Sequence, residues 1–442
     1  MRAPLTGDRG PRPLRVLFEG LWWFDGPDSN RQVLRDIVRA WAEAFPDDEA
    51  HLVVPRRQAE RVRAEAPPAV TVHGTRFSQH GLGCLLGVGW LARRLRTDAV
   101  LTHNFPTLVG PRPTVFLHDL IFESNPEWFT RAERAYLRVI SLTIGRARSV
   151  VTSSGTEAAR IRRLHPGLDV TPVGLAAPSD LTGAEPRPPA GGPLPGVQLS
   201  GGPASGLRPG GFHLAVGRLN ARKNLGFAIR VADAAGWITP DRPLAVVGSR
   251  SGLAEDACPV EAGGPADGTG RADGRGPVNG AGPADHRHPA DGLARLRELR
   301  DRGAVVFLGR VDPGELAWLY RGALSLIYTS RDEGFGMPPV EAMAFGCPVV
   351  ASDIPVLREV TGGHAAVVLP LGDEAAAAAA LRAAGPEHLR AAGTAGREHA
   401  LRSYAWEDTA RRIRAAMVRG LGDDGAARPA PLAAGAREAG TP

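Results

Sequence analysis

The sequence predicts an α/β fold in two domains, in each of which short parallel strands alternate with helices. The length of 442 residues and the hydrophobic content of 43% are enough for two cores. Residues 15–54 have the pattern of a strand, a helix and a second strand, and residues 323–351 repeat this order. An alternation of this kind favours parallel sheets whose connections are helices.

The N-terminal domain is expected to span residues 14–180, after a disordered polar tail of residues 1–13. Its first strand is RVLFE, residues 15–19, and an aromatic-rich loop follows it. Ser29 and Gln32 have the spacing of a capping box, which predicts that the first helix begins there. The other predicted elements are strands at 52–54, 70–72, 98–102, 114–117 and 149–152 and a helix at 131–142.

Residues 181–211 are rich in Pro, Gly, Ala and Ser and predict a flexible linker. The C-terminal domain is expected at residues 212–420. It is interrupted by a low-complexity insertion, residues 255–292, that is predicted to be disordered. A disordered tail, residues 421–442, ends the chain. The predicted elements of this domain are strands at 212–217, 243–247, 305–308, 323–328, 349–351 and 365–369 and helices at 225–235, 293–302, 312–320 and 374–384.

The chemistry of the chain centres on residues 323–353. A predicted strand ends in a turn with Gly334 and Gly336, and a helix follows from Pro338 to Gly346. No Ser, Thr, Asp or Asn directly precedes that helix, so its first N–H groups are available to an anionic ligand. Two carboxylates, Glu333 and Glu341, lie on either side of the glycine loop.

A second segment, GRLNARKN at residues 217–224, supplies positive charge before another predicted helix. Lys223 is the one lysine among 53 basic residues, which suggests a position that needs a compact ammonium group. Arg222 and Lys223 precede the positive end of a helix dipole, which is unfavourable unless an anion binds between them and the helix. The alternative is that both are solvated cations.

Composition argues against several classes of protein. The net charge is +6, but the basic residues alternate with acidic ones, so nucleic-acid binding is not expected. Three cysteines without paired spacing predict neither a disulfide framework nor a zinc site, which fits a cytoplasmic protein. The N-terminus lacks the apolar core of a signal peptide.

Trp90 with Arg93, Arg94 and Arg96 indicates either a half-buried helix or a peripheral contact with the inner face of a membrane.

The motif EGFGMPPVE, followed by AMAFGCPVVASD, resembles the signature of the retaining family 4 glycosyltransferases. The resemblance implies the GT-B fold, in which two Rossmann-like domains face each other across a cleft. It also implies that a hexose moves from a nucleotide sugar to a hydroxyl of a glycan, lipid-linked or small-molecule acceptor. The segment around HDL at residues 118–120 favours GDP-mannose as donor, with a UDP-sugar as the alternative. No cofactor and no metal are expected.

In the C-terminal domain, the resemblance assigns Arg218 and Lys223 to the donor phosphates and Glu333 to the hydroxyls of the donor sugar. Glu341 is assigned to the ribose, although a carboxylate in the first turn of a helix is favourable without any ligand. The remaining donor-binding positions are expected to act mainly through the backbone: Gly334, Phe335, Gly336, Met337 and, next to the base, Val311.

In the N-terminal domain, the resemblance assigns His118 to the donor sugar, and His103 is a weaker candidate. Asp119 is expected to orient His118 or to bind the acceptor. Arg31 is expected to be either a solvated arginine or a contact for a phosphate or the acceptor. Trp406 resembles the start of the terminal helix that returns to the first domain in this fold.

Two other functions agree with the same motifs. One is a catalytically silent module that binds a nucleotide sugar, and the other is an epimerase or phosphorylase on the same architecture. The products formed from a nucleotide sugar distinguish them from a transferase.

Overall fold

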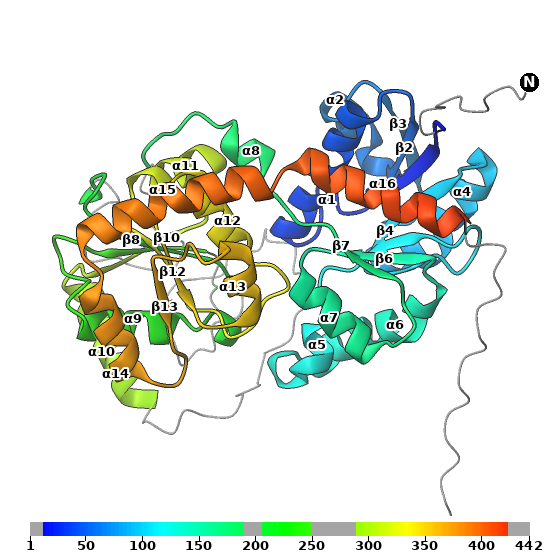
Figure 1. Ribbon diagram of the computed structural model, residues 1–442. Helices are drawn as coiled ribbons and strands as arrows, with labels where there is room; N and C mark the ends of the chain where they lie inside the picture. The colour runs from blue at the N-terminus through cyan, green and yellow to red at the C-terminus, as the bar shows by residue number, and fades with distance from the viewer. Residues whose placement is uncertain (1–11, 190–205, 219, 249–288, 423–442) are drawn as a thin grey trace, which may run out of the picture.

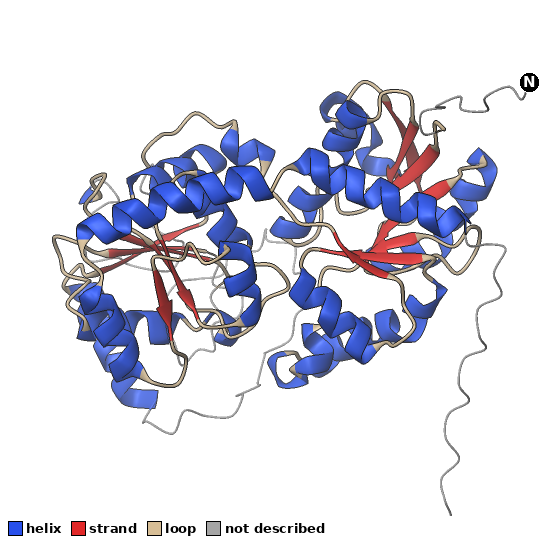
Figure 2. Ribbon diagram, in the orientation of Figure 1, coloured by secondary structure: helices blue, strands red, loops and turns tan. Residues whose placement is uncertain are grey.

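The computed structural model describes residues 12–189, 206–218, 220–248 and 289–422, which form two α/β domains side by side (Figure 1). Each domain has a central parallel sheet with helices on both faces (Figure 2). The predicted fold class, with two Rossmann-like domains, is therefore confirmed. Most of the predicted tails, linker and insertion lie outside the described residues.

The N-terminal sheet has seven parallel strands in the order β3-β2-β1-β4-β5-β6-β7. Strand order reverses between β1 and β4, and ligands of such sheets bind at the carboxyl ends of the strands at this point. The strands are β1 (Arg15–Glu19), β2 (Glu49–Pro55), β3 (Val70–Thr75), β4 (Ala99–His103), β5 (Thr114–Phe116), β6 (Ser149–Thr152) and β7 (Val170–Pro172).

The helices of this domain cover both faces of the sheet. They are α1 (Asp28–Ala44), α2 (Ala59–Glu65), α3 (His80–Leu82), the π-helical turn η2 (Gly83–Val88), α4 (Gly89–Leu95), α5 (Ile121–Ser124), α6 (Arg131–Thr143) and α7 (Gly155–Leu164). The short helix α8 (Ser179–Thr182) follows and packs beside α11 (Pro313–Gly322) of the other domain (Figure 1). The 3₁₀ turns are η1 (Arg56–Gln58), η3 (Pro126–Trp128) and η4 (Ile144–Arg146).

The capping box predicted at Ser29 and Gln32 is wrong. Helix α1 begins at Asp28, after Pro27, and no side chain caps it. Ser29 therefore lies inside the first turn, where its hydroxyl donates to Asn30 instead of accepting from the backbone. The carboxylate of Asp28 in that turn is favourable at the positive end of the helix, which explains the earlier start.

The C-terminal sheet has six parallel strands in the order β10-β9-β8-β11-β12-β13, which repeats the topology of the first six strands of the other sheet. The strands are β8 (His213–Val216), β9 (Leu244–Val247), β10 (Val305–Gly309), β11 (Leu326–Tyr328), β12 (Val349–Ser352) and β13 (Val367–Leu369). The helices are η6 (Ala221–Lys223), α9 (Leu225–Ala234), α10 (Pro289–Asp301), α11 (Pro313–Gly322), α12 (Met337–Ala344), α13 (Pro355–Thr361), α14 (Glu374–Ala383), α15 (Pro386–Ser403) and α16 (Trp406–Gly422).

Some boundaries differ from the prediction. Helix α10 begins at Pro289, inside the predicted insertion, and β11 begins only at Leu326. Strand β7 and helices α7 and α15 were not predicted. The alanines and glycines of α15 carry little periodicity, and its buried positions include Gly393, where a Cβ would lie 2.5 Å from the carbonyl oxygen of Gly346.

Helix α16 joins the two domains. It continues from α15 on the C-terminal domain and packs on α1 and β6 of the N-terminal domain (Figure 1). Nε1 of Trp406 donates to the carbonyl of Ala177 at 2.9 Å. Further along, Arg414 makes a two-pronged ion pair with Asp48, with distances of 2.9 and 3.0 Å, and both side chains are buried. The last helix is thus part of the N-terminal domain in space.

We expect Arg414→Ala to destabilise the protein by about 3–5 kcal/mol, because Asp48 would remain buried without its partner. Arg411 is the matched control, since it lies on the same helix but forms exposed pairs with Glu407 and Asp408. Arg411→Ala should change stability by less than about 1 kcal/mol. Calorimetric unfolding of both variants checks this, and equal shifts in the midpoint would contradict it.

Candidate active site

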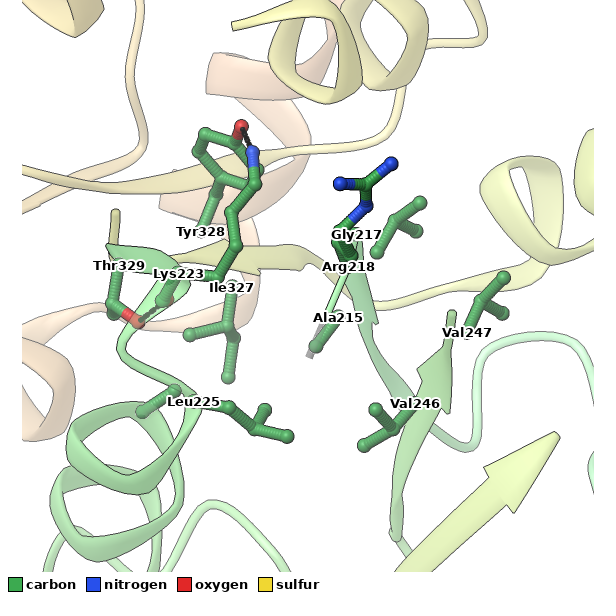
Figure 3. A pocket seen from close by; sticks show the side chains of 12 residues that line it. Ala215, Gly217, Arg218, Lys223, Leu225, Val246, Val247, Ile327, Tyr328 and Thr329 are labelled. Atoms are coloured by element: carbon green, nitrogen blue, oxygen red, sulfur yellow. Dashed lines mark hydrogen bonds between the residues drawn. The ribbon is translucent and has the colours of Figure 1, made fainter. Parts of the chain in front are cut away.

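The candidate site lies at the reversal point of the C-terminal sheet, where the carboxyl ends of β8 and β11 are neighbours. A pocket opens there, lined among others by Gly217, Arg218, Lys223, Tyr328 and Thr329 (Figure 3). Gly217 and Arg218 directly follow β8, and Thr329 follows β11. This is the position at which a parallel sheet of this topology binds ligands.

Glu333 holds two cations together at this edge. Its Oε1 accepts from Nζ of Lys223 at 2.5 Å, and its Oε2 pairs with Arg222. The hydroxyl of Tyr328 donates to Oε1 of Glu333 at 2.7 Å and accepts from Nζ of Lys223. The ammonium lies 4.7 Å from the centre of the Tyr328 ring. Four side chains from three segments therefore form one hydrogen-bonded cluster.

Burial and pairing decide the charges of this cluster. Burial by itself raises the pKa of Glu333, but Arg222 and Lys223 outweigh burial and hold the pKa well below its usual range. Burial lowers the pKa of Lys223 to about 8, and Glu333 only partly offsets it. The side chains of Lys223 and Glu333 are 15% and 8% exposed. Near neutral pH the cluster contains one carboxylate and two cations, a net positive charge.

Glu341 has a different environment. It lies on α12 and is buried, and its Oε2 accepts from the hydroxyl of Tyr320 at 2.8 Å. Burial raises its pKa to about 7, although Tyr320 and Lys223 act in the opposite direction. Helix α12 begins at Met337, so the prediction that Glu341 lies in the first turn is wrong. The helix dipole therefore does not account for this carboxylate.

The glycine loop contacts the N-terminal domain directly. A Cβ on Gly334 would lie 2.8 Å from the carbonyl oxygen of His118 and 3.0 Å from Cβ of Asp119, so only glycine fits there. The hydroxyls of Ser153 and Ser154 donate to the carbonyl of Gly334 at 3.2 and 2.7 Å. The loop is thus held from both domains.

The start of α12 is uncapped, as the sequence predicts, but Pro338 and Pro339 have no N–H, so of its first three residues only Met337 can donate to a ligand. Gly336, with φ of 98°, precedes the helix, and no side chain caps it. The side chain of Phe335 is buried and packs edge-on against Tyr404, so it belongs to the core. Met337 and Val311 are partly buried and pack against the same core.

His118 follows β5, and its backbone carbonyl lies against Gly334 of the glycine loop. Its Nε2 is 3.1 Å from Nδ1 of His103, so the two rings share a hydrogen bond. Burial and the neighbouring His103 lower the pKa of His118 well below its usual value, so His118 is a neutral imidazole. His103, and not Asp119, is the residue that orients this ring.

Asp119 accepts from the backbone N–H of Ile121 at 3.2 Å, and burial raises its pKa.

Arg31 donates to the carbonyl of Phe24 at 2.8 Å and pairs with Asp28. Asp28 also pairs with Arg310 of the other domain at 2.6 Å. Arg31 therefore lies in an ion-pair chain at the domain boundary. Arg218 lies on the pocket wall and is exposed.

More polar contacts join the domains beside the site. Arg160 pairs with Asp332, the residue before Glu333, and the amide of Asn125 donates to Asp332 at 3.1 Å. Glu359 of α13 accepts from the backbone N–H groups of Gly155 and Thr156 at 2.6 and 2.8 Å. A carboxylate of one domain thus binds the N-terminus of α7 in the other.

The sequence interpretation missed several members of the site. Tyr328 was identified only as the last residue of a predicted apolar strand, and Tyr320 lies on a helix without a motif. The sequence indicates Arg222 as a cation near a bound anion but does not predict its ion pair with Glu333. The signal for Tyr328 was a single polar group at the carboxyl end of β11, which is the binding edge of the sheet.

Comparisons with known proteins agree with this geometry. Residues 210–398 match the family described as glycosyl transferases group 1. O-antigen chain mannosyltransferase RfbU of Salmonella typhimurium is 52% identical over 73 residues, 16% of this chain and 20% of that protein. D-inositol 3-phosphate glycosyltransferase of Mycobacterium bovis is 27% identical over 363 residues, 77% of this chain and 61% of that protein. The chain thus covers less than two thirds of either relative.

Among solved structures, sucrose-phosphate synthase from Thermosynechococcus elongatus matches with a TM-score of 0.58 and 19% identity. The match covers 92% of this chain and 99% of that chain. A similarity at this level of identity shows the fold. The predicted GT-B architecture is confirmed, and the predicted resemblance is confirmed for residues 210–398.

We expect the affinity for a nucleoside diphosphate such as GDP to fall above about pH 8, because Lys223 then loses its proton and its charge. One lost proton weakens binding by at most about tenfold per pH unit. Isothermal titration calorimetry between pH 6.5 and 9.5 (roughly 1.5 units on either side of that pKa) measures this. Lys223→Arg should flatten the profile, since arginine stays charged. A wild-type affinity that does not change across this range would exclude Lys223 from anion binding.

Proposed function

We propose that this chain, whose residues 210–398 match the family described as glycosyl transferases group 1, is a retaining glycosyltransferase. It moves a hexose from a nucleotide sugar to a hydroxyl acceptor in glycan or glycolipid synthesis. The observation that carries the proposal is the cluster of Lys223, Arg222, Tyr328 and Glu333 at the binding edge of the C-terminal sheet.

The reaction needs charge to be absorbed at the leaving group. When the bond between the anomeric carbon and the diphosphate oxygen breaks, the nucleoside diphosphate leaves with the bonding electrons and the sugar becomes cationic. Lys223 and Arg218 line the pocket wall and supply positive charge for that diphosphate, and the N–H of Met337 at the positive end of α12 adds to it. We propose that these groups take the place of a divalent metal.

Glu333 has two roles in this proposal. It stays ionised, because its pKa is held low, and it positions the cations on either side of it. Its negative charge also stabilises the developing oxocarbenium ion and accepts hydrogen bonds from the sugar. His118, held by His103, binds the sugar from the other domain as a neutral donor. The acceptor hydroxyl attacks on the face that the diphosphate leaves, and a phosphate oxygen takes its proton.

The donor is assigned as GDP-mannose first and a UDP-sugar second. The resemblance of HDL and EGFGMPPVE to mannosyltransferase motifs supports this order, as does the name of the Salmonella relative. Glu341 is assigned to the ribose. Its pKa is about 7, so above neutral pH it is a carboxylate that accepts hydrogen bonds from the ribose hydroxyls. The acceptor is a glycan, a lipid-linked sugar or a small molecule.

Incubation with a panel of nucleotide sugars and hydroxyl acceptors tests the function. We expect a glycosylated product and free nucleoside diphosphate, at rates that added magnesium or manganese does not change. Lys223→Ala should lower turnover by about 100-fold or more, because a donor to the leaving group is lost. Arg230→Ala is the matched control, because it removes a cation from α9 that pairs with Glu374 at the surface.

Each other outcome has a defined meaning. Activity that a chelator abolishes and manganese restores would contradict the metal-free mechanism. A bound donor without any product would favour the silent binding module. Release of an epimer, or formation of a sugar phosphate, would favour the epimerase or phosphorylase.

We further propose a peripheral contact with an anionic membrane through the helical stretch of residues 80–95. Among the residues that the structure describes, no helix combines the length and the hydropathy that a membrane span needs. Leu82, Leu86 and Trp90 follow one another at every fourth position and are 53%, 43% and 59% exposed. Arg93 and Arg94 follow them, and Arg94 lies 5.7 Å from the ring of Trp90. This combination is typical of interfacial helices.

Sedimentation with vesicles containing anionic lipid tests this contact. We expect the wild type to bind and the double variant Leu86→Asp, Trp90→Asp to lose binding, with a much weaker effect on neutral vesicles. Leu401→Asp, at an exposed leucine of α15, is the control and should bind as the wild type does. Equal binding of both variants would show that the stretch is only a half-exposed helix.

A further inference from the structure

The reversal point of the N-terminal sheet holds a second buried polar cluster, for which the proposed transfer has no use. It consists of Glu19 at the end of β1, His80 at the start of α3 and Cys84 in η2. All three are buried, and one potential ligand atom from each lies within 4.8 Å of the others. We propose that these three residues form a zinc site.

The distances fit tetrahedral coordination. Nε2 of His80 is 3.2 Å from Oε2 of Glu19 and 3.6 Å from Sγ of Cys84. Zinc bonds of about 2.0–2.1 Å to nitrogen, 2.0–2.2 Å to oxygen and 2.3 Å to sulfur at tetrahedral angles place these pairs at about 3.4 and 3.6 Å. These two pairs already have the separation that the ion requires, and the third pair, Glu19 and Cys84, lies within 4.8 Å.

The backbone explains why the cluster forms. His80 and Cys84 are four residues apart, so they lie on one face of the helical stretch. A Cβ on Gly83 would lie 2.2 Å from the side chain of Leu21, so glycine lets this stretch approach the loop after β1 and bring both side chains to Glu19. The helix widens to a π turn at Gly83–Val88, a feature that is frequent at functional sites.

The charges also balance. A zinc ion with one carboxylate, one thiolate and one neutral imidazole makes a neutral group, which is the least costly form in a buried position. Without a cation, burial and the nearby Glu19 raise the pKa of Cys84 far above its usual value. A bound dication reverses this effect and favours the thiolate. Carboxylate, imidazole and thiolate are all ligands that zinc accepts.

Two neighbours complete the surroundings. The ring of Trp22 stacks on His80 at 3.6 Å between centres and is half-buried, so it covers the cluster on the side of the loop after β1. His103, at the end of β4, is buried and its Nε2 has no hydrogen-bond partner. Its backbone N–H donates to Glu19 at 3.4 Å. The ring of His103 lies outside the group of three ligand atoms, so a water molecule is left to supply the fourth ligand.

Cobalt titration of the full-length protein, stripped of metal by a chelator, tests the site without any activity assay. We expect one cobalt ion per chain, with tetrahedral bands and a thiolate-to-cobalt charge-transfer band, and displacement by zinc. Cys84→Ala should abolish the charge-transfer band. Cys347→Ala is the matched control, because Cys347 is equally buried but, among the described residues, belongs to no group of potential metal ligands. Its titration should equal that of the wild type.

His80→Phe provides an independent test, because it keeps an aromatic ring against Trp22 and removes the nitrogen ligands. We expect its cobalt affinity to fall by at least about tenfold, while circular dichroism and the unfolding midpoint report that each variant is folded. A wild type that binds no stoichiometric cobalt would overturn the proposal, as would a charge-transfer band that persists in Cys84→Ala. Either result would leave the proposed sugar transfer untouched, since metal binding is measured separately.

Discussion

One carboxylate between two cations determines how the C-terminal domain can work. Lys223 and Glu333 are 110 residues apart in the chain, yet they meet because β8 and β11 are neighbours in the sheet. Each charge in this cluster is tolerated at low exposure only because an opposite charge is within hydrogen-bond distance. Tyr328 adds a hydroxyl that bonds to both Lys223 and Glu333 and fixes their separation. The site is therefore pre-organised before any ligand binds.

The same edge of the sheet is completed by the other domain. The carbonyl of Gly334 is bound by Ser153 and Ser154, and the absence of a side chain on Gly334 lets His118 approach. Asp332 and Glu359 add charged contacts across the boundary. Helix α16 returns the chain to the N-terminal domain, where the buried pair of Arg414 and Asp48 anchors it. The conformation of the glycine loop thus depends on both domains.

The two sheets share one topology but carry different chemistry at their reversal points. In the C-terminal sheet, Arg222 and Lys223 follow β8 and pair with Glu333, which follows β11. The net positive charge of this group suits a diphosphate. In the N-terminal sheet the residues near β1 and β4 are Glu19, His80, Cys84 and His103, which suit a cation. The two rings of His103 and His118 connect this second cluster to the glycine loop. A repeated fold therefore presents opposite charges at equivalent positions.

Sequence by itself determined the features that depend on neighbours along the chain. Strand periodicity located β1, β6 and β9 closely, and the glycine loop and the uncapped start of α12 followed from turn and capping preferences. The start of α1 was misplaced because the carboxylate of Asp28 and the fixed backbone of Pro27 outweighed a capping pattern one residue later. Lys223 stood out because it is the only lysine.

Tertiary structure alone decided which side chains meet. Arg222 pairs with Glu333, Tyr320 binds Glu341, and His103 orients His118, and none of these pairs has a local signal. His80 and Cys84 carry no signal of a metal site in the sequence, and only the fold places Glu19 beside them. The physical reason is that such contacts depend on strand order and on close approach of backbones, whereas capping, turn and periodicity preferences act over only a few residues.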